Sequence, residues 1–285
     1  MAAPSPRPVD RYAVLGNPVA HSRSPAIHAA FAAATGQPMT YERVLAPLDG
    51  FEATLREFAA GGAKGCNVTV PFKFEAFRLC SRQTERAQLA EAANTLRFDP
   101  EGWWADNTDG IGLIVDIERN AAQPVAGQRV LLIGAGGAAA GVLGPLLEAG
   151  PAQVVVANRS RDRAEALCER HQALARRQAC ALRASGLGDP GEAFDIVLNA
   201  SASSLAGDTT PVPDSALRRG ALAVDLMYGP AAAAFLAWAE AHGARGRDGL
   251  GMLVEQAAEA FLQWRGVRPD TAPVLAALRA QDTGR

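Results

Sequence analysis

The stretch RVLLIGAGGAAAGVLGPLL, residues 129–147, constrains the fold of this chain more than any other. An apolar run is followed by a glycine-rich turn and then by an alanine- and leucine-rich segment, which predicts a strand, a tight turn and a helix. The segment from Val130 onward carries no charge, yet five glycines and Pro145 interrupt it, so a membrane span is not expected.

The turn fits the pattern G-x-G-x-x-G/A, with Gly134, Gly136 and Ala139 in the three small positions. Gly134 permits the tight turn, Gly136 lets a ligand approach the backbone, and the helix N-terminus supplies free N–H groups. An alanine-rich chain produces chance matches to such a motif, so the flanking strand and helix carry the argument. They predict a dinucleotide-binding turn.

Strands and helices alternate along the rest of the chain, which predicts an α/β fold with mainly parallel sheets. The segments expected to form strands are 12–16, 40–46, 66–70, 92–98, 130–134, 153–160, 194–201 and 221–228. The segments expected to form helices are 24–34, 51–60, 72–79, 110–120, 134–147, 161–177, 231–243 and 251–266. Ser24 is expected to cap the first helix, with Pro25 at its first position. The series restarts near residue 110.

Composition excludes several functional classes. The 285 residues carry a formal net charge of −2, which offers no electrostatic basis for binding nucleic acid or a membrane surface. The four cysteines form no C-x-x-C pair and the four histidines are scattered, so no metal site is expected. The opening MAAPSPRP lacks the apolar core of a signal peptide, which favours a soluble cytoplasmic protein.

The end of the second strand after the glycine turn indicates which dinucleotide binds. An NAD enzyme usually places Asp or Glu there to hold the ribose 2′-hydroxyl, whereas this chain has Asn158, Arg159 and Ser160. A guanidinium and a hydroxyl suit a 2′-phosphate, so NADP(H) is favoured. The alternative is that Arg159 is a solvated surface arginine in an arginine-rich chain.

Three polar clusters precede the glycine turn, and each follows a predicted strand. They are HSRSP (21–25), NVTVPFK (67–73), and Asn94-Thr-Leu with DNTDG (106–110). Taken singly, each has a structural explanation: Ser24 caps a helix, Asn94 and Asp109 fix turns, and Lys73 is solvated. Taken together, their hydroxyls, amides, lysine and carboxylate suit a polyhydroxylated substrate.

Lys73 is one of only two lysines among 28 basic residues. Reduction of a ketone by hydride leaves an alkoxide that needs a proton. A lysine ammonium can stabilise and protonate it, whereas an arginine loses its proton too reluctantly. Lys73 is therefore the candidate proton donor or electrostatic stabiliser, with a nearby carboxylate to orient it.

The chain resembles the bacterial, NADP-specific shikimate dehydrogenases. The matching motifs occur in the family's order and are spread over nearly the whole chain apart from the N-terminal tail and 165–193. They are GNPVAHSRSP (16–25), CNVTVPFK (66–73), AANTL (92–96), DNTDGIG (106–112), LIGAGGAA (132–139), NRS (158–160), DLMY (225–228) and DGLGMLVEQAAEAF (248–261). The resemblance implies reversible reduction of 3-dehydroshikimate to shikimate by NADPH in aromatic amino-acid biosynthesis. It also implies a substrate domain made of 1–109 and 244–285, and a Rossmann NADP-binding domain over 110–243.

By position, the resemblance implies a role for each matched residue. Lys73 and Asp109 would be the catalytic pair. The substrate-binding residues would be Ser22, Ser24, Asn67, Thr69, Asn94, Tyr228 and Gln256. The cofactor-binding residues would be Gly134, Ala135, Gly136, Gly137, Ala138, Asn158, Arg159, Ser160, Met227 and Gly249. A monomer or homodimer is expected, with no partner beyond small molecules.

The chain departs from the family pattern at three places. The family often has Asn-Ala-Thr-Ser-Ser-Gly where residues 199–204 read NASASS, Ala105 replaces a usual glycine, and Ser160 replaces a usual threonine. Two rival functions are a quinate/shikimate dehydrogenase that uses NAD, and a catalytically silent NADP-binding regulator. An acidic residue near Asn158 would favour the first and loss of Lys73 or Asp109 the second, and the chain shows neither feature.

Overall fold

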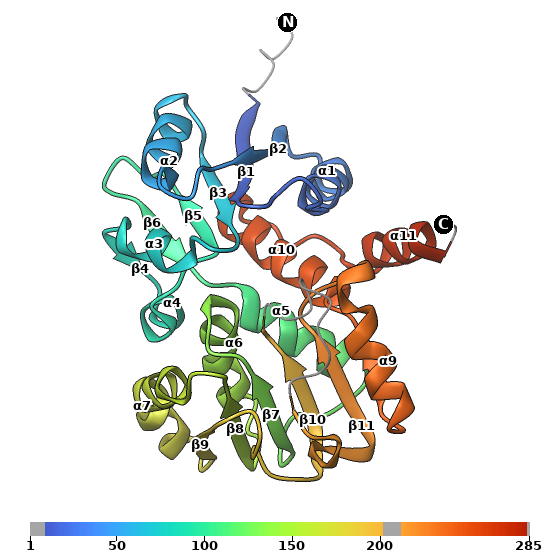
Figure 1. Ribbon diagram of the computed structural model, residues 1–285. Coiled ribbons are helices and arrows are strands. Elements are labelled where there is room, and N and C mark those ends of the chain that lie inside the picture. The colour runs from blue at the N-terminus through green and yellow to red at the C-terminus, as the bar shows by residue number, and fades with distance from the viewer. Residues whose placement is uncertain (1–8, 202–211, 284–285) are drawn as a thin grey trace, which may run out of the picture. The chain divides into compact units, whose positions relative to one another are not determined.

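The structure is a computed structural model that describes residues 9–201 and 212–283. Its contacts divide the described chain into two compact units, whose elements are labelled in Figure 1. Unit 1 holds residues 9–108 and Ala257–Gln281, and unit 2 holds Asp109–Gln256. The second boundary falls inside the long helix α10 (Leu250–Arg265), so this helix contributes residues to both units.

Unit 2 contains a six-stranded sheet in the order β12-β11-β10-β7-β8-β9, with every neighbouring pair parallel. Its strands are β7 (Arg129–Ile133), β8 (Gln153–Ala157), β9 (Ala181–Ser185), β10 (Phe194–Asn199), β11 (Leu217–Asp225) and β12 (Arg245–Arg247). This is the strand order of dinucleotide-binding folds, and it confirms the predicted α/β class with a Rossmann sheet. The central strands are continuous buried apolar runs, as parallel strands covered on both faces require.

Two strands of this sheet were not predicted from the sequence. β9 alternates between exposed and half-buried residues, and β12 is only the three residues Arg-Gly-Arg. Both lie at the edges of the sheet, where no apolar run is needed. Because β12 pairs with β11, the sheet extends beyond residue 243.

The helices of unit 2 follow the predicted positions closely. They are α5 (Asp109–Val115), the π-helical turn η1 (Asp116–Asn120), α6 (Gly137–Glu148), α7 (Arg161–Arg177), the short turns η2 (Asp214–Ala216) and η3 (Gly229–Ala232), and α9 (Ala233–Ala241). The uncharged stretch 130–147 divides into β7 and α6, as its glycines predict. No helix in the described ranges is both long and apolar enough to span a bilayer.

Unit 1 contains a second six-stranded sheet, in the order β2-β1-β3-β5-β6-β4. Its strands are β1 (Asp10–Gly16), β2 (Met39–Leu45), β3 (Gly65–Val68), β4 (Arg82–Gln83), β5 (Thr95–Arg97) and β6 (Trp104–Asp106). The first three strands are parallel, but β5 is antiparallel to both β3 and β6. This sheet is therefore mixed, because the short link from β5 to β6 makes a hairpin rather than a helical crossover.

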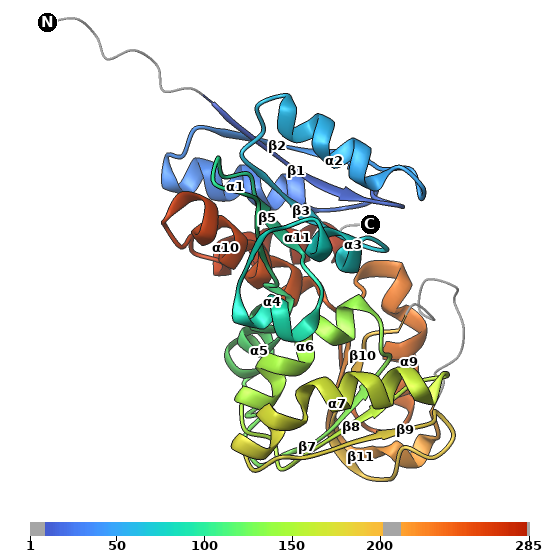
Figure 2. The same cartoon turned by 90° about the vertical axis from the view of Figure 1, so that its left-hand side faces the viewer.

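Helices cover both faces of the β1–β3 region. These are α1 (Ser24–Thr35) and α2 (Phe51–Ala60). The other helices are α3 (Lys73–Arg78), α4 (Glu85–Ala90) and α11 (Ala272–Thr283), in addition to α10. Figures 1 and 2 show α1 and α2 on opposite sides of β1 and β2. One face packs Leu15 and Cys66 against Phe51 and Leu55 of α2. The other face carries the polar residue Asn67, which lies in register with Val14.

Candidate active site

The glycine turn after β7 has the conformation that the motif predicts. Gly134 has φ +109°, and a Cβ atom there would lie 3.0 Å from the backbone of Ala200, so glycine is required for two independent reasons. A Cβ at Gly136 would meet nothing within 4 Å, which leaves open space above the backbone. The turn leads directly into α6, whose first residue is Gly137. Together with Ala135 and Ala138, these residues form a cradle that fits a pyrophosphate at a helix N-terminus.

The turn after β8 carries exposed hydrogen-bond donors. The backbone N–H of Asn158 donates to the carbonyl of Ser185, and its side-chain amide donates to the carbonyl of Ser160 at 2.8 Å. These bonds fix the turn and leave Arg159 exposed beside the N-terminus of α7. The strand end carries an amide, a guanidinium and a hydroxyl rather than a carboxylate, so its donors fit NADP(H).

A buried polar pair, Asn199 and Asp225, links the ends of β10 and β11. The Asn199 amide donates to Asp225 Oδ2 at 3.0 Å, and Asp225 Oδ1 accepts from the backbone N–H of Met227 at 2.8 Å. The carbonyl of Met227 in turn accepts from the N–H of Gly249 at 2.8 Å. The predicted residues Met227 and Gly249 are thus brought together. Asn199 and Asp225 were not predicted, although DLMY and NAS mark their positions.

The neighbouring positions complete this loop region. Tyr228 follows β11 closely and is half-buried. A Cβ at Gly249 would collide with the backbone of Leu226, so this close approach also needs a glycine. Of residues 199–204, where the chain departs from the family pattern, the structure describes 199–201, and 202–204 lie outside the described residues.

Asp109 and Gln256 lie on two helices of unit 2 that pack closely. Asp109 is the first residue of α5 and is buried. A Cβ added at Gly112, one turn later, would lie 2.6 Å from Cβ of Gln256 on α10. The Gln256 amide is buried and donates to the carbonyl of Leu253 at 3.0 Å. The glycine therefore lets α5 and α10 approach, which sets the positions of both predicted residues.

In unit 1, the hydroxyls of Ser22 and Ser24 are 3.2 Å apart. The carbonyl of Ser22 accepts two hydrogen bonds from Arg43 of β2, from Nε at 2.9 Å and from Nη2 at 2.6 Å. Ser24 was wrongly predicted as the N-cap. It is the first helical residue, Arg23 holds the cap position without a side-chain capping bond, and the Ser24 hydroxyl bonds with Ser22 instead.

Asn67 and Asn94 belong to one buried hydrogen-bond network. The Asn67 amide donates to the carbonyl of Asn94 at 3.0 Å and to the hydroxyl of Thr95 at 3.1 Å. The side-chain carbonyl of Asn94 accepts from the backbone N–H of Thr108 at 2.8 Å, and its amide donates to the Thr108 hydroxyl at 3.0 Å. Tyr41 of β2 donates its hydroxyl to Asn67 Oδ1 at 2.7 Å. Tyr41, Thr95 and Thr108 were not predicted as members of this network.

A buried carboxylate holds the segment before Thr108. Asp106 is fully buried and accepts from Thr84 Oγ1 at 2.6 Å, from the backbone N–H of Asn107 at 2.7 Å and from both Nε and Nη2 of Arg86. Burial alone would lower the pKa of Arg86, but its bonds to Asp106 and to Glu259 outweigh burial and raise the pKa. The first aspartate of the DNTDG run is therefore structural rather than catalytic.

Lys73 and Thr69 flank the turn after β3. Lys73 is half-buried, begins α3, and accepts a hydrogen bond at its carbonyl from the N–H of Ala93 at 2.9 Å. That bond ties the lysine to the residue before Asn94. The Thr69 side chain lies against Gly16 of β1, where a Cβ atom would collide with the Thr69 methyl group. The structure thus gathers Ser22, Ser24, Asn67, Thr69, Lys73 and Asn94 within unit 1 and Asp109, Tyr228, Gln256 and the cofactor residues within unit 2.

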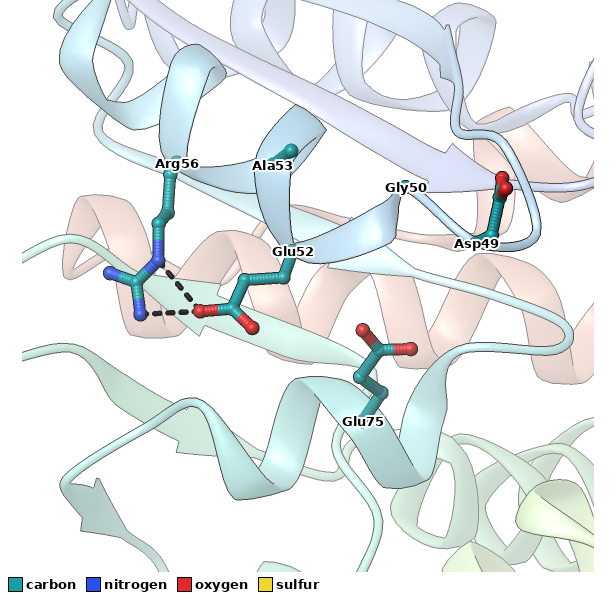
Figure 3. Close-up of a pocket in the computed structure, with 6 residues that line it drawn as sticks. All are labelled: Asp49, Gly50, Glu52, Ala53, Arg56 and Glu75. Atoms are coloured by element: carbon teal, nitrogen blue, oxygen red, sulfur yellow. Dashed lines mark hydrogen bonds and ion pairs between the residues drawn. The ribbon is translucent and has the colours of Figure 1, made fainter.

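The pocket in Figure 3 is distinct from these residues. It lies on unit 1 and is lined by Asp49, Gly50, Glu52, Ala53, Arg56 and Glu75. Its one arginine is already paired with Glu52 at 2.7 Å. Three carboxylates with a neutralised arginine do not suit an anionic substrate, so the pocket is not the candidate site.

In the described residues, the cysteines are not suited to act as nucleophiles, and no metal site is formed. All four cysteines are buried thiols, and burial raises the pKa of each, to about 12 for Cys80 and Cys168. A thiol held protonated in this way is a poor nucleophile. No group of three or more His, Cys, Asp or Glu side chains in the described parts of the chain is arranged to hold a metal ion.

Comparisons with known proteins identify the relatives of this chain. Three family profiles match consecutive segments: the shikimate dehydrogenase substrate binding domain at 14–96, shikimate / quinate 5-dehydrogenase at 116–226, and the shikimate 5′-dehydrogenase C-terminal domain at 249–279. The shikimate dehydrogenase (NADP(+)) of Methylibium petroleiphilum is 64% identical, over 95% of this chain and 94% of that protein.

Solved structures of similar proteins have the same fold as this chain. The shikimate 5-dehydrogenase of Thermus thermophilus in complex with NADP(H) and shikimate superposes with a TM-score of 0.83 at 33% identity, covering 95% of this chain and 99% of that one. The Ael1 enzyme of Pseudomonas putida superposes with a TM-score of 0.84 at 49% identity, covering 94% of this chain and 98% of that one.

Proposed function

Because the chain belongs to the shikimate dehydrogenase family, we propose that it catalyses the reversible, NADPH-dependent reduction of 3-dehydroshikimate to shikimate in aromatic amino-acid biosynthesis. It is an oxidoreductase that uses NADP(H). The observation that carries the proposal is 64% identity over 95% of the chain to an NADP-dependent shikimate dehydrogenase, with Lys73 and Asp109 both present.

The catalytic pair in this proposal is Lys73 and Asp109. Bound NADPH supplies the hydride, and the protein supplies the charge stabilisation and the proton. The Lys73 ammonium stabilises the oxyanion that develops on the substrate and donates the proton to it. The Asp109 carboxylate orients the ammonium, and in the oxidative direction the same groups remove the hydroxyl proton.

Substrate recognition is assigned to Ser22, Ser24, Asn67, Thr69, Asn94, Tyr228 and Gln256. Hydroxyls and amides both donate and accept, so they can match a ring that carries several hydroxyl groups and a carboxylate. The loop that carries Ser22 and Ser24 is held by Arg43 at the Ser22 carbonyl, and its two hydroxyls can rotate from each other to donate to a carboxylate.

Cofactor recognition is assigned to the glycine turn and to the turn after β8. Gly134, Ala135, Gly136, Gly137 and Ala138 would hold the pyrophosphate by their backbone N–H groups. Asn158, Arg159 and Ser160 would hold the 2′-phosphate, and Met227 and Gly249 would lie near the nicotinamide. A 2′-phosphate next to an exposed guanidinium forms charge-assisted hydrogen bonds that NAD lacks.

The remaining assignments follow from the same family membership. We propose a cytoplasmic monomer or homodimer that binds no nucleic acid and no membrane. The functional division into a substrate-binding part over 1–109 and 244–285, and a cofactor-binding part over 110–243, is also a proposal.

Initial rates with purified protein test this function. Shikimate and quinate are each offered with NADP⁺ and with NAD⁺, and kcat/KM is determined for all four combinations. The pair shikimate and NADP⁺ is expected to give the highest value. A higher value for quinate with NAD⁺ would instead favour a quinate dehydrogenase, and an absence of turnover in all four would favour a silent NADP-binding protein.

A further inference from the structure

The Tyr41 hydroxyl joins the polar network of unit 1 from a neighbouring strand. Tyr41 lies on β2 in register with Tyr12 of β1, and Asn67 lies on β3 in register with Val14 of β1. The alternation of side chains along strands places Tyr12, Tyr41 and Asn67 on one face of the sheet. The hydrogen bond from Tyr41 to Asn67 Oδ1, at 2.7 Å, therefore spans β1.

The Asn94 carbonyl determines which way the Asn67 amide points, and the Tyr41 hydroxyl holds the amide oxygen in place. Both N–H groups of Asn67 are engaged, one with the carbonyl of Asn94 and one with the hydroxyl of Thr95. Its oxygen accepts from Tyr41. Reversal of the amide would place its oxygen against the Asn94 carbonyl, which can only accept, whereas the Tyr41 hydroxyl can bond with either end of the amide. The Asn94 carbonyl therefore fixes the orientation. Asn94 is held in turn through its backbone carbonyl.

His28 of α1 keeps the tyrosine ring in place. The His28 and Tyr41 rings stack with their centroids 4.2 Å apart and an angle of 10° between their planes, and the centroids of the Trp264 and His28 rings are 5.5 Å apart. Burial lowers the pKa of His28 to about 3, although nearby Asn67 opposes the shift. Neither ring nitrogen makes a hydrogen bond of normal length within the described chain, so His28 packs as a neutral aromatic.

The serine loop also reaches Tyr41. Burial raises the pKa of Tyr41 well above its usual value, and the hydroxyl of Ser24 opposes this by hydrogen bonding. Ser24 is in contact with Ser22 through their hydroxyls. Tyr41 thus stands between the serine pair and the two asparagines, all of which are assigned above to the substrate.

We propose that Tyr41 is a positioning residue for substrate binding: its hydroxyl anchors the oxygen of the Asn67 amide and so holds the Asn67 side chain and, through it, Asn94 in place. This role rests on the proposed function, because it concerns the binding of the shikimate ring. Tyr41 acts through Asn67, so its loss weakens substrate binding and leaves the chemical step and the cofactor site unaltered.

The test is Tyr41→Phe, with Tyr12→Phe as the matched control. The phenylalanine keeps the stack on His28 and removes only the hydroxyl. Tyr12 lies on the same face and stacks on Trp264 at 4.6 Å, but its hydroxyl accepts from Arg265 at 3.4 Å, away from the asparagines. Loss of one buried hydrogen bond is expected to raise KM for shikimate about 3- to 30-fold in Tyr41→Phe. Its kcat and its KM for NADP⁺ stay within about twofold, and Tyr12→Phe leaves all three constants unchanged.

A double variant separates positioning from general destabilisation. In an Asn67→Ala background, Tyr41→Phe is expected to cause no further rise in KM, because the residue it acts through is gone. An unchanged shikimate KM in Tyr41→Phe alone, or its full effect in the Asn67→Ala background, overturns the positioning role while wild-type activity stands. A wild-type protein that fails to oxidise shikimate with NADP⁺ overturns the proposed function, and this role with it.

Discussion

Removal of Arg86 is expected to destabilise unit 1 strongly, and the reason is the carboxylate that it neutralises. Asp106 is fully buried, whereas the Arg86 side chain is 24% exposed and binds Asp106 through two nitrogens. In Arg86→Met, Asp106 keeps its bonds from Thr84 and from the N–H of Asn107 but loses its counter-charge. Breaking a buried ion pair by removing one partner costs about 3–5 kcal/mol.

Urea unfolding followed by tryptophan fluorescence measures this effect. Three of the four tryptophans, Trp103, Trp104 and Trp264, lie in unit 1 and report on its unfolding. The double variant Arg86→Met/Asp106→Asn removes the charge and is expected to recover most of the stability.

The control is Arg82→Met, because Arg82 is half-exposed and pairs with Asp99 at 3.2 Å. Its loss should cost about 0–1 kcal/mol. The reasoning fails if Arg86→Met costs no more than Arg82→Met, or if the double variant is no more stable than the single one.

Three further predictions concern the cofactor site and the pH dependence of stability. Arg159→Ala is expected to weaken NADPH about 10- to 100-fold while NADH changes little, and equal losses in Kd for both would contradict the 2′-phosphate assignment. Gly134→Ala forces a side chain into φ +109° and against Ala200, so it should cost about 1–3 kcal/mol and weaken NADP(H) binding, which titration calorimetry would detect. Burial lowers the pKa of His28 to about 3 and that of His171 to about 4, whereas the pKa of histidine in the unfolded chain is 6.5. As the pH falls, both histidines therefore become protonated in the unfolded chain before they do so in the folded one. The contribution of each neutral histidine to the free energy of unfolding is fully present above the unfolded pKa, and it falls by about 2 kcal/mol between about pH 7 and 5. His28→Phe should remove about half of the decline, and an unchanged urea-midpoint slope against pH would argue against it.

Periodicity and turn chemistry predicted the elements that bury apolar surface. The helix over 161–177 has its predicted bounds, and β7 (Arg129–Ile133) lies within one residue of the strand predicted over 130–134, because an amphipathic stripe and a β-branched run specify them locally. The short strands β4, β6, β9 and β12 were missed, since two or three residues, or an exposed run at a sheet edge, hold no periodic apolar pattern. The mixed direction of the unit 1 sheet depends on a hairpin whose turn, Asp-Pro-Glu-Gly at 99–102, is visible in the sequence, but the three-residue strand β6 that follows it was not predicted.

Some residues of the candidate site could be predicted from sequence motifs, and others could not. Gly134 was predictable because its positive φ demands glycine, and Lys73 because the chain almost never uses lysine. Tyr41 and Arg86 were not, because their partners lie 26 and 20 positions away in the sequence. Contacts of that kind are formed by the fold and leave no local signature.

The catalytic role of Lys73 is the central claim, and the turnover number of Lys73→Ala with shikimate and NADP⁺ tests it most directly. The account predicts that kcat falls by several orders of magnitude, because charge stabilisation and proton donation are both lost, while KM for shikimate changes little. Far-ultraviolet circular dichroism of the variant checks that the fold is retained. A folded Lys73→Ala protein that turns over at the wild-type rate would contradict the account.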